Sequence, residues 1–183
     1  MDRISCSNFI IVSGSGRKVG KTHLAVSLIK HFAPQASIIA LKISPHKHDK
    51  LGNVLPIASS PGYRLFQELE VHEKNSGQFL KAGAISSFFL EAEDGFLSNA
   101  IQEFSNSCNP MNLPVICESG ALGTLIRPGL MYYIEDTEEQ ANSNKESIKR
   151  LADIVLPARK FSAREVISNI YLKGNSWFTT SPL

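Results

Sequence analysis

A strand, a glycine-rich turn and an amphipathic helix follow one another near the start of this chain and constrain its fold most. Phe9 to Val12 form a short, wholly apolar run, typical of a strand buried in a parallel sheet. Gly14, Gly16 and Gly20 follow, and apolar residues then recur at helical spacing between Lys21 and Phe32. This order of elements predicts the first unit of an α/β fold.

Apolar runs and helical spacing continue to alternate along the rest of the chain. The predicted strands or extended segments cover 37–43, 63–71, 84–90, 114–117, 130–134 and 153–156. The predicted helices cover 74–81, 94–104 with Asp94 as N-cap, 146–151 and 163–172. The polar, proline-containing segment 44–62 predicts a loop. The alternation predicts an α/β protein with a mostly parallel sheet and helices on both faces.

Length and composition limit the classes of protein to consider. A chain of 183 residues with 43% hydrophobic residues predicts a single domain over 1–183, with a loose tail at 174–183. The net charge of +2 argues against a nucleic-acid partner. The three cysteines are far apart and fit no metal-ligand spacing, and the first apolar run is too short for a membrane span. We expect a cytoplasmic protein with no membrane partner.

The turn has the residues needed to hold a polyphosphate. Glycine lets the backbone approach phosphate closely, and the positive end of the helix that begins near Lys21 favours anions. We expect Lys21 to reach the outer phosphates of ATP or GTP and the Thr22 hydroxyl to bind Mg²⁺. The residues expected to hold the nucleotide are Gly14, Ser15, Gly16, Arg17, Lys18, Val19, Gly20, Lys21, Thr22 and His23. For Arg17 and Lys18, a solvated pair of loop side chains is an equal alternative.

Glu118 is the second candidate for the same site. It follows the predicted strand 114–117, and ligands of open α/β sheets bind beyond the carboxyl ends of the strands. A carboxylate there can hold Mg²⁺ directly or through water. We therefore expect Thr22 and Glu118 to bind the metal, and Lys21 and Glu118 to be the catalytic residues. The alternative is a strand-end glutamate that faces solvent or caps the next turn.

These patterns resemble those of P-loop nucleoside triphosphate hydrolases, and of two families in particular. The loop resembles that of dethiobiotin synthetase, in which a glycine also lies one place earlier than usual; Ser15 stands at the usual glycine or alanine position. From Phe9 to Leu130 the chain is similar to the molybdopterin-guanine dinucleotide biosynthesis adaptor protein. That similarity is carried by Leu41-Lys42-Ile43 followed by His46 and His48, by Glu70 in place of Asp, by Lys74-Asn75-Ser76 and Ala82-Gly83-Ala84, and by Cys117-Glu118-Ser119.

Five further residues are candidates for contact with a second ligand. Lys42 ends a predicted buried strand, where its charge needs a partner such as Glu118 or a phosphate. His46 and His48 follow it in a polar segment, for which a loop without a metal is the simpler interpretation. Lys74 and Ser76 stand near a predicted helix start, where they hold an anion or cap the helix. We expect the segment from His46 to Ser76 to form the wall of this second site.

Three functions are compatible with these expectations. The resemblance to the adaptor implies a nucleotide-binding, weakly hydrolytic partner of a molybdenum-cofactor enzyme, with GTP as the preferred nucleotide. The resemblance to dethiobiotin synthetase implies an enzyme that uses ATP to activate a small carboxylate or carbamate. The third is a regulatory triphosphatase that switches shape. The base stays undecided, because Asn142-Ser143-Asn144-Lys145 is not a guanine-binding string. A homodimer stays an alternative to a monomer.

Overall fold

Strand β1 (Ile4–Gly14) occupies an inner position of the sheet because both of its faces are apolar. The computed structural model describes residues 3–47, 52–73, 76–93, 95–136 and 143–180. Within them Ile10 and Val12 point into one core, while Phe9 and Ile11 point into the other. A strand that is apolar on both sides needs cover on both sides, so β1 cannot lie at an edge facing solvent.

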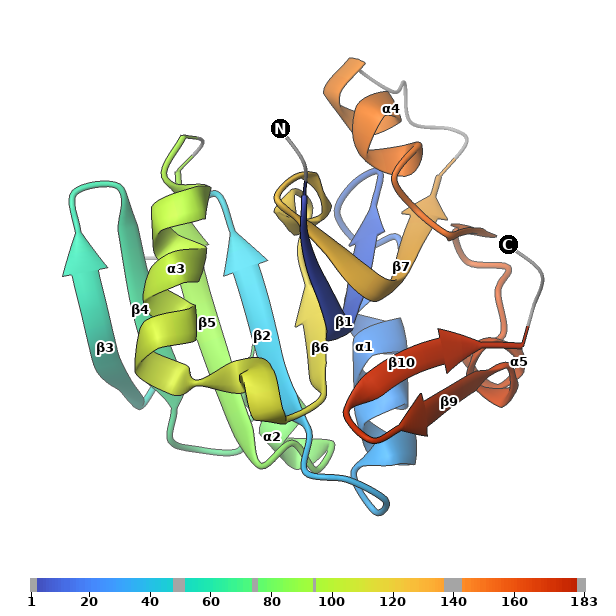
Figure 1. Cartoon of the computed structure of the whole chain (residues 1–183), viewed down its shortest axis with the longest axis horizontal. Helices are drawn as coiled ribbons and strands as arrows, with labels where there is room; N and C mark the ends of the chain where they lie inside the picture. The colour runs from blue at the N-terminus through green and yellow to red at the C-terminus, as the bar shows by residue number, and fades with distance from the viewer. Residues whose placement is uncertain (1–2, 48–51, 74–75, 94, 137–142, 181–183) are drawn as a thin grey trace.

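The main sheet has eight strands in the order β3-β4-β5-β2-β6-β1-β7-β8 (Figure 1). The other seven strands are β2 (Ile39–Ser44), β3 (Val54–Ser60), β4 (Tyr63–Glu68), β5 (Ser86–Ala92), β6 (Val115–Glu118), β7 (Ile126–Glu135) and β8 (Ile154–Pro157). Neighbouring strands are parallel throughout the stretch β5-β2-β6-β1-β7-β8. The two pairs at the other end of the sheet, β3-β4 and β4-β5, are antiparallel. The expected α/β architecture with a mostly parallel sheet is confirmed.

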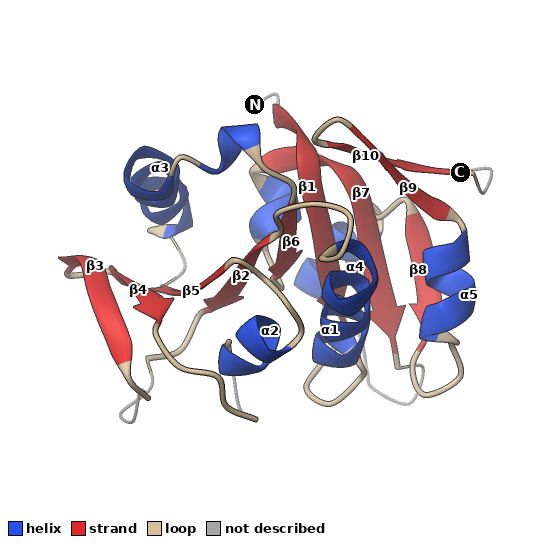
Figure 2. Ribbon diagram, turned by 90° about the horizontal axis from the view of Figure 1, so that it is seen from below, coloured by secondary structure: helices blue, strands red, loops and turns tan. Residues whose placement is uncertain are grey.

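Helices cover both faces of this sheet. They are α1 (Lys21–Phe32), α2 (Gly77–Lys81), α3 (Leu97–Cys108), α4 (Ser143–Lys149) and α5 (Ala163–Ser168). Apolar side chains of α1, α2 and α5 belong to one core, and those of α3 and α4 belong to the other. Figure 2 shows α3 on one side of the strands and α1 and α2 on the opposite side.

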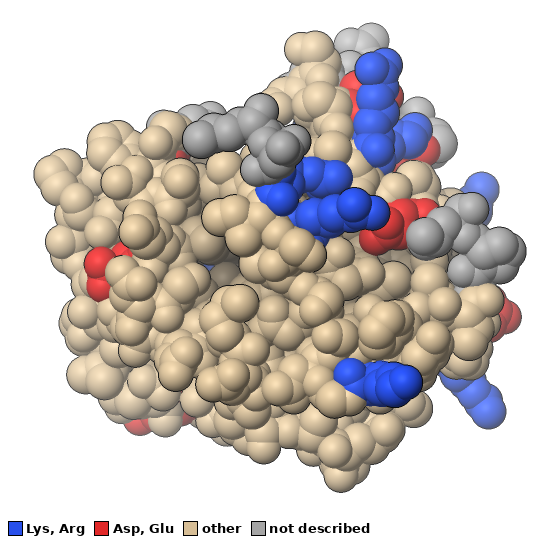
Figure 3. All heavy atoms as spheres, in the orientation of Figure 1, with Lys and Arg blue, Asp and Glu red and all other residues tan. Residues whose placement is uncertain are grey.

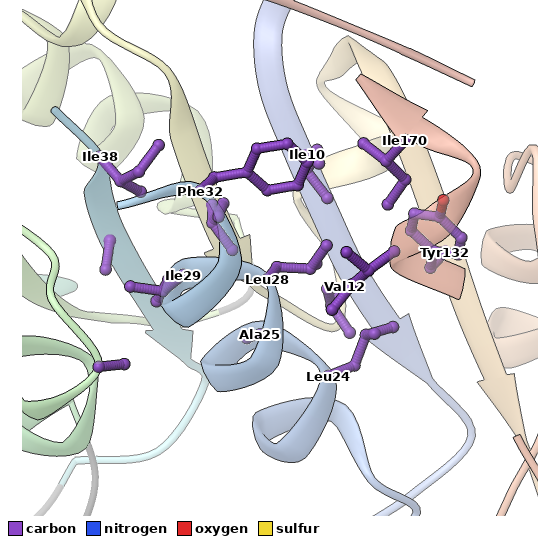
Figure 4. Packing of buried hydrophobic residues seen from close by; sticks show 14 of the residues in the cluster. Ile10, Val12, Leu24, Ala25, Leu28, Ile29, Phe32, Ile38, Tyr132 and Ile170 are labelled. Carbon is purple, nitrogen blue, oxygen red and sulfur yellow. The ribbon is translucent and has the colours of Figure 1, made fainter. Parts of the chain in front are cut away.

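Helix α1 packs along β1 with the apolar stripe that its sequence predicts. Leu24, Ala25, Leu28, Ile29 and Phe32 are buried, and Figure 4 shows them turned toward the side chains of the sheet. Burying one Leu or Ile side chain contributes about 1.5–3 kcal/mol. This packing holds the start of α1 at the end of β1, which fixes the turn between them.

The parallel strands end along one edge of the sheet, which is the upper edge in Figure 1. The register places Glu118 of β6 directly beside Val12 of β1 on one side and beside Lys42 of β2 on the other. Side chains directly opposite each other on neighbouring strands point to the same face. The strand pairing alone therefore brings Lys42 and Glu118 together.

A hairpin of β9 (Ile170–Lys173) and β10 (Ser176–Thr179) packs beside the start of β1. The Trp177 side chain is 1% exposed, and its Nε1 donates a hydrogen bond to the carbonyl oxygen of Asn8 at 2.9 Å. Its ring also meets the ring of Phe32 edge to face, with 4.9 Å between centroids. Trp177 thus joins the hairpin to both β1 and α1.

Three secondary-structure predictions were wrong. The segment 44–62 contains strand β3, in which Pro56 is tolerated because β3 lies at the edge of the sheet. The predicted helix 163–172 ends at Ser168, and its remainder is strand β9. The predicted loose tail contains strand β10, while residues 181–183 lie outside the described part.

Three helix starts also differ from the prediction. Helix α4 begins at Ser143, three residues earlier than expected. Helix α3 begins at Leu97 with Phe96 as its N-cap, and Asp94 lies outside the described residues. Helix α2 begins at Gly77, three residues later than expected. None of the helices described combines the length and the apolar character needed to cross a membrane.

The contacts of Trp177 predict that Trp177→Ala strongly destabilises the fold. The change removes a fully buried ring together with its hydrogen bond, and such losses cost about 3–5 kcal/mol. Phe178→Ala is the matched control on the same strand, because that ring is 40% exposed and an exposed side chain contributes about 1 kcal/mol or less. Urea unfolding followed by circular dichroism measures both. Equal losses for the two variants would contradict an anchoring role of Trp177.

Candidate functional site

The turn between β1 and α1 depends on two glycines. A Cβ atom at Gly14 would lie 2.6 Å from the carbonyl oxygen of Ile134, so only glycine lets β1 run this close to β7. Gly20 is the N-cap of α1 with a φ of 115°, a left-handed conformation that favours glycine. Its missing side chain also leaves room for the Phe161 ring, from which a Cβ would be 3.0 Å away. The glycines expected to approach phosphate are therefore also required by the protein itself.

Ser15 stands where the ordinary loop pattern has glycine or alanine, and its contacts explain the difference. Its backbone N–H donates to the Ile134 carbonyl oxygen at 3.0 Å, and its Oγ accepts a hydrogen bond from the backbone N–H of Asp136 at 2.9 Å. The Ser15 side chain is 4% exposed. These two hydrogen bonds of Ser15 hold the first part of the loop against the end of β7.

Lys21 and Thr22 form the first turn of α1, where the backbone N–H groups of a helix have no partner within the helix. No side chain caps this helix start, because the N-cap residue is Gly20. The Lys21 Nζ donates a hydrogen bond to the carbonyl oxygen of Gly16 and so spans the loop. A positive helix end and a lysine therefore face the same loop, which suits an anion.

Glu118 is the centre of a hydrogen-bonded group at the carboxyl edge of the sheet. Its Oε2 accepts a hydrogen bond from the Thr22 hydroxyl at 2.7 Å. The Lys42 Nζ lies 3.3 Å from Oε1 and 3.2 Å from Oε2. The two charged side chains are only 9% (Glu118) and 19% (Lys42) exposed. Because a buried carboxylate is costly without a positive partner, Lys42 supplies the cation that Glu118 needs at this position.

Cys117 lies directly before Glu118 and is completely buried. Burial raises the pKa of the Cys117 thiol well above its usual value, and the negative charge of Glu118 raises it further. The raised pKa favours the neutral thiol, and Cys117 packs as a buried member of the core on the α3 side of the sheet. The polar groups available at the carboxyl edge of the sheet therefore include the Thr22 hydroxyl, the Glu118 carboxylate and the Lys42 amine.

A cavity of about 1060 Å³ opens over the loop, and we call it the loop cavity. Among the described residues, five cationic side chains and one carboxylate, that of Glu118, line this cavity. Its lining is Gly14, Ser15, Gly16, Arg17, Lys18, Gly20, Lys21, Thr22, His23, Lys42, Ile43, Ser44, Pro45, His46, Glu118, Gly120 and Lys145. Figure 3 shows several Lys and Arg side chains over α4, with acidic side chains beside them. The positive excess favours an anionic ligand.

The structure brings most of the predicted site residues together. All of the expected loop residues line the loop cavity except Val19, which is 2% exposed and belongs to the core beneath the loop. Lys42, His46 and Glu118 line it too. Arg17 and Lys18 are exposed at its rim. His48 and Lys74 lie outside the described residues, so their predicted contacts stay predictions.

Ser76 is not part of this site. It is 0% exposed and donates a hydrogen bond to the buried carboxylate of Glu68, which His72 also contacts at 3.2 Å. Ser87, in the first half of β5, donates to the Ser76 carbonyl oxygen at 2.8 Å. The loop cavity lies at the carboxyl ends of the parallel strands, whereas these residues lie toward their amino ends. The expectation that the whole segment from His46 to Ser76 walls one site is therefore wrong for Ser76.

Several contacts of the site were not predicted. Ile134 and Asp136 hold Ser15 through backbone groups, and Lys145 of α4 lines the loop cavity. Backbone contacts leave no signal in the pattern of side chains, and Lys145 ends the polar segment Asn142-Ser143-Asn144-Lys145, which contains no recognisable binding motif. Its position becomes visible only when α4 is seen above the carboxyl edge of the sheet (Figure 1).

Comparison with known proteins gives no relative on which to base a function. No protein-family model matches the chain, and neither sequence nor structure searches found a significant match among characterised proteins or solved structures. The interpretation of the site therefore depends on its own geometry.

The pairing of Lys42 with Glu118 predicts a measurable coupling energy in the ligand-free protein. Lys42→Met should destabilise the fold by about 1–3 kcal/mol, because it leaves a buried carboxylate without its cation. Adding Glu118→Gln should recover part of that loss, with a coupling of about 0.5–3 kcal/mol. Urea unfolding of the wild type, both single variants and the double variant measures it.

Lys47→Met provides the matched control for this cycle. Lys47 pairs with Glu93 at 2.8 Å, but both side chains are about half exposed, so its loss should cost about 0–1 kcal/mol. Strictly additive effects of Lys42→Met and Glu118→Gln would show that the contact contributes nothing to stability.

Proposed function

We propose that this chain binds the phosphates of a nucleoside triphosphate together with Mg²⁺ in the loop cavity. One observation carries the proposal: the Thr22 hydroxyl at the start of α1 contacts Glu118 at the end of a neighbouring strand, beside Lys21. A hydroxyl and a carboxylate that converge at a helix N-terminus form a set of hard oxygen donors next to an anion site. These are the groups that a magnesium–triphosphate complex needs.

The donor set fits magnesium better than a softer metal. Mg²⁺ prefers oxygen ligands and is usually held by one or two protein groups together with phosphate oxygens and water. Thr22 and Glu118 would supply the protein groups. The bound ion would neutralise charge on the outer phosphates. In its absence Lys42 provides the positive charge that Glu118 needs, and on binding Lys42 becomes available to contact a phosphate or a substrate.

The loop itself would hold the phosphates by its backbone and by Lys21. Lys21 donates a hydrogen bond to the Gly16 carbonyl oxygen, which places its amine across the turn. An incoming phosphate replaces this neutral acceptor with a charged one, and charge-assisted hydrogen bonds are roughly twice as strong. Ser15 and Val19 keep the loop in place, since both are buried.

The resemblances in the sequence supply the candidates for a wider role. A weakly hydrolytic partner of a molybdenum-cofactor enzyme follows from the resemblance to the adaptor family. An enzyme that activates a small carboxylate with ATP is the second candidate, favoured by a cavity that adjoins the loop cavity at Gly14 and Gly120. Measuring the affinities for ATP and GTP side by side would show whether the site prefers adenine or guanine.

The phosphate-binding role predicts that Lys21→Ala greatly weakens triphosphate binding and leaves the fold intact. One charge-assisted contact contributes about 1.5–3 kcal/mol, so affinity should fall roughly 10- to 150-fold. Calorimetric titration with each triphosphate and Mg²⁺ measures the loss, and circular dichroism checks the fold. Lys30→Ala is the control, because Lys30 is exposed in the last turn of α1. Unchanged affinity in folded Lys21→Ala would refute the proposal.

The proposed metal role of Glu118 predicts a loss that depends on magnesium. Glu118→Gln keeps the size of the side chain but removes the negative charge that a hard cation requires. Triphosphate affinity should therefore fall more in Mg²⁺ than in a chelator, measured by the same titration. Glu165→Gln on α5 should change neither value, since Glu165 is exposed outside the loop cavity. Equal losses in both conditions would mean that Glu118 acts only as a structural partner of Lys42.

A further inference from the structure

A second cavity of about 480 Å³ continues from the loop cavity toward the α3 face of the sheet, and we call it the side cavity. Its volume falls within the range of about 300–1,000 Å³ of sites for small organic ligands. The two cavities share six lining residues: Gly14, Ile43, Pro45, His46, Gly120 and Lys145. A ligand in the side cavity therefore lies next to whatever the loop holds.

The wall of the side cavity is mainly apolar, unlike that of the loop cavity. Ala92 ends β5, Leu97 begins α3, Ile148 belongs to α4 and Tyr133 belongs to β7. Ala121 adds a small side chain from the segment after β6. Four separate elements and a loop thus converge on one apolar pocket, which suits a compact organic body.

The side cavity adjoins the outer end of the proposed triphosphate. Thr22 at the start of α1 contacts Glu118 at the end of β6, and both line the loop cavity. Thr22 and Glu118 would hold a magnesium ion at this point, and the ion would neutralise charge on the outer phosphates. Ser119 and Gly120 directly follow Glu118 and line the side cavity. A molecule in the side cavity is therefore next to the outermost phosphate.

Charge at the junction of the cavities selects for an anion. His46 and Lys145 both lie among the shared residues, and Asn144 and Ser119 add polar groups. No Asp or Glu is among the described residues that line the side cavity. A carboxylate at the junction would lie within reach of Lys145 and could form a charge-assisted hydrogen bond with it.

We propose that the side cavity binds a small organic anion whose apolar body lies against Leu97, Ala121 and Ile148 and whose charged end lies at Lys145. This inference deepens the proposed triphosphate function and rests on it, because it makes the anion the second ligand of the same site. The ligand class is a carboxylate or a similar acid with an aromatic or branched apolar part.

The test uses 4-phenylbutyrate as the probe, with 4-phenylbutylamine as a probe of the same body and opposite charge. Protein labelled on Ile and Leu methyl groups is saturated with Mg²⁺ and a non-hydrolysable triphosphate and is then titrated while the methyl spectrum is recorded. The methyls of Ile43, Leu97 and Ile148 should shift with the carboxylate. Those of Ile154, which lines a separate pocket beside α5, should not. The amine should bind at least about tenfold more weakly.

Two variants locate the probe. Ala121→Trp fills the side cavity and should abolish the shifts, while triphosphate affinity changes by no more than about twofold, since Ala121 does not line the loop cavity. Lys145→Met keeps an apolar side chain of similar length but removes the charge. It should weaken the binding of 4-phenylbutyrate at least about tenfold without weakening the binding of 4-phenylbutylamine.

The outcomes separate this inference from the triphosphate proposal. If the protein binds the triphosphate but the probe shifts no methyl signal, only the proposed anion-binding role of the side cavity is refuted. Probe shifts that persist in Ala121→Trp, or a probe that competes with the triphosphate, overturn it as well. Probe shifts in a protein that binds no triphosphate uphold the anion pocket and reject the phosphate role of the loop. Lys21→Ala without nucleotide should still show the shifts, because Lys21 does not line the side cavity.

Discussion

The largely buried charge of Glu118 is the constraint on which the candidate site depends. A carboxylate at this position needs a cation and a hydrogen-bond donor, and they come from different elements, Lys42 on β2 and Thr22 on α1. Satisfying one side chain therefore fixes the relative positions of two strands and a helix. The same three groups then surround the point at which a metal and a phosphate would meet. Stability and the proposed binding role are carried by the same contacts.

The part of the fold built from contiguous patterns was predictable from sequence. Helix α1 begins and ends where its apolar spacing indicated, and the runs before Gly14 and around Glu118 are strands as expected. The position of Lys42 beside Glu118 was one of two options, because a lysine at a strand end needs either a carboxylate or a phosphate. The strand register places Lys42 beside the carboxylate of Glu118.

The errors occur where distant contacts decide the structure. Strand β3 has little burial of its own and forms by pairing with β4, and β10 forms because Trp177 reaches a core made by α1 and β1. Ser76 resembled a ligand-binding residue in its local sequence, yet it lies inside the protein and hydrogen-bonds to Glu68. The side cavity is assembled from six elements (β1, β2, β5, β7, α3 and α4) and two loops, which are far apart in sequence. No local pattern contains such information.

The link between Trp177 and Asn8 also bears on how the chain folds as it is synthesised. The two residues are separated by 169 positions, and β1 pairs with β6 and β7, which follow it by about a hundred residues or more. Contacts between such distant segments form slowly, because a long loop must close before they are gained. On the ribosome, β1 and α1 emerge first but cannot be enclosed until residues 115–135 and 170–179 have been made. During that interval the apolar run from Phe9 to Val12 in β1 is exposed, and it is the segment that a chaperone would be expected to cover.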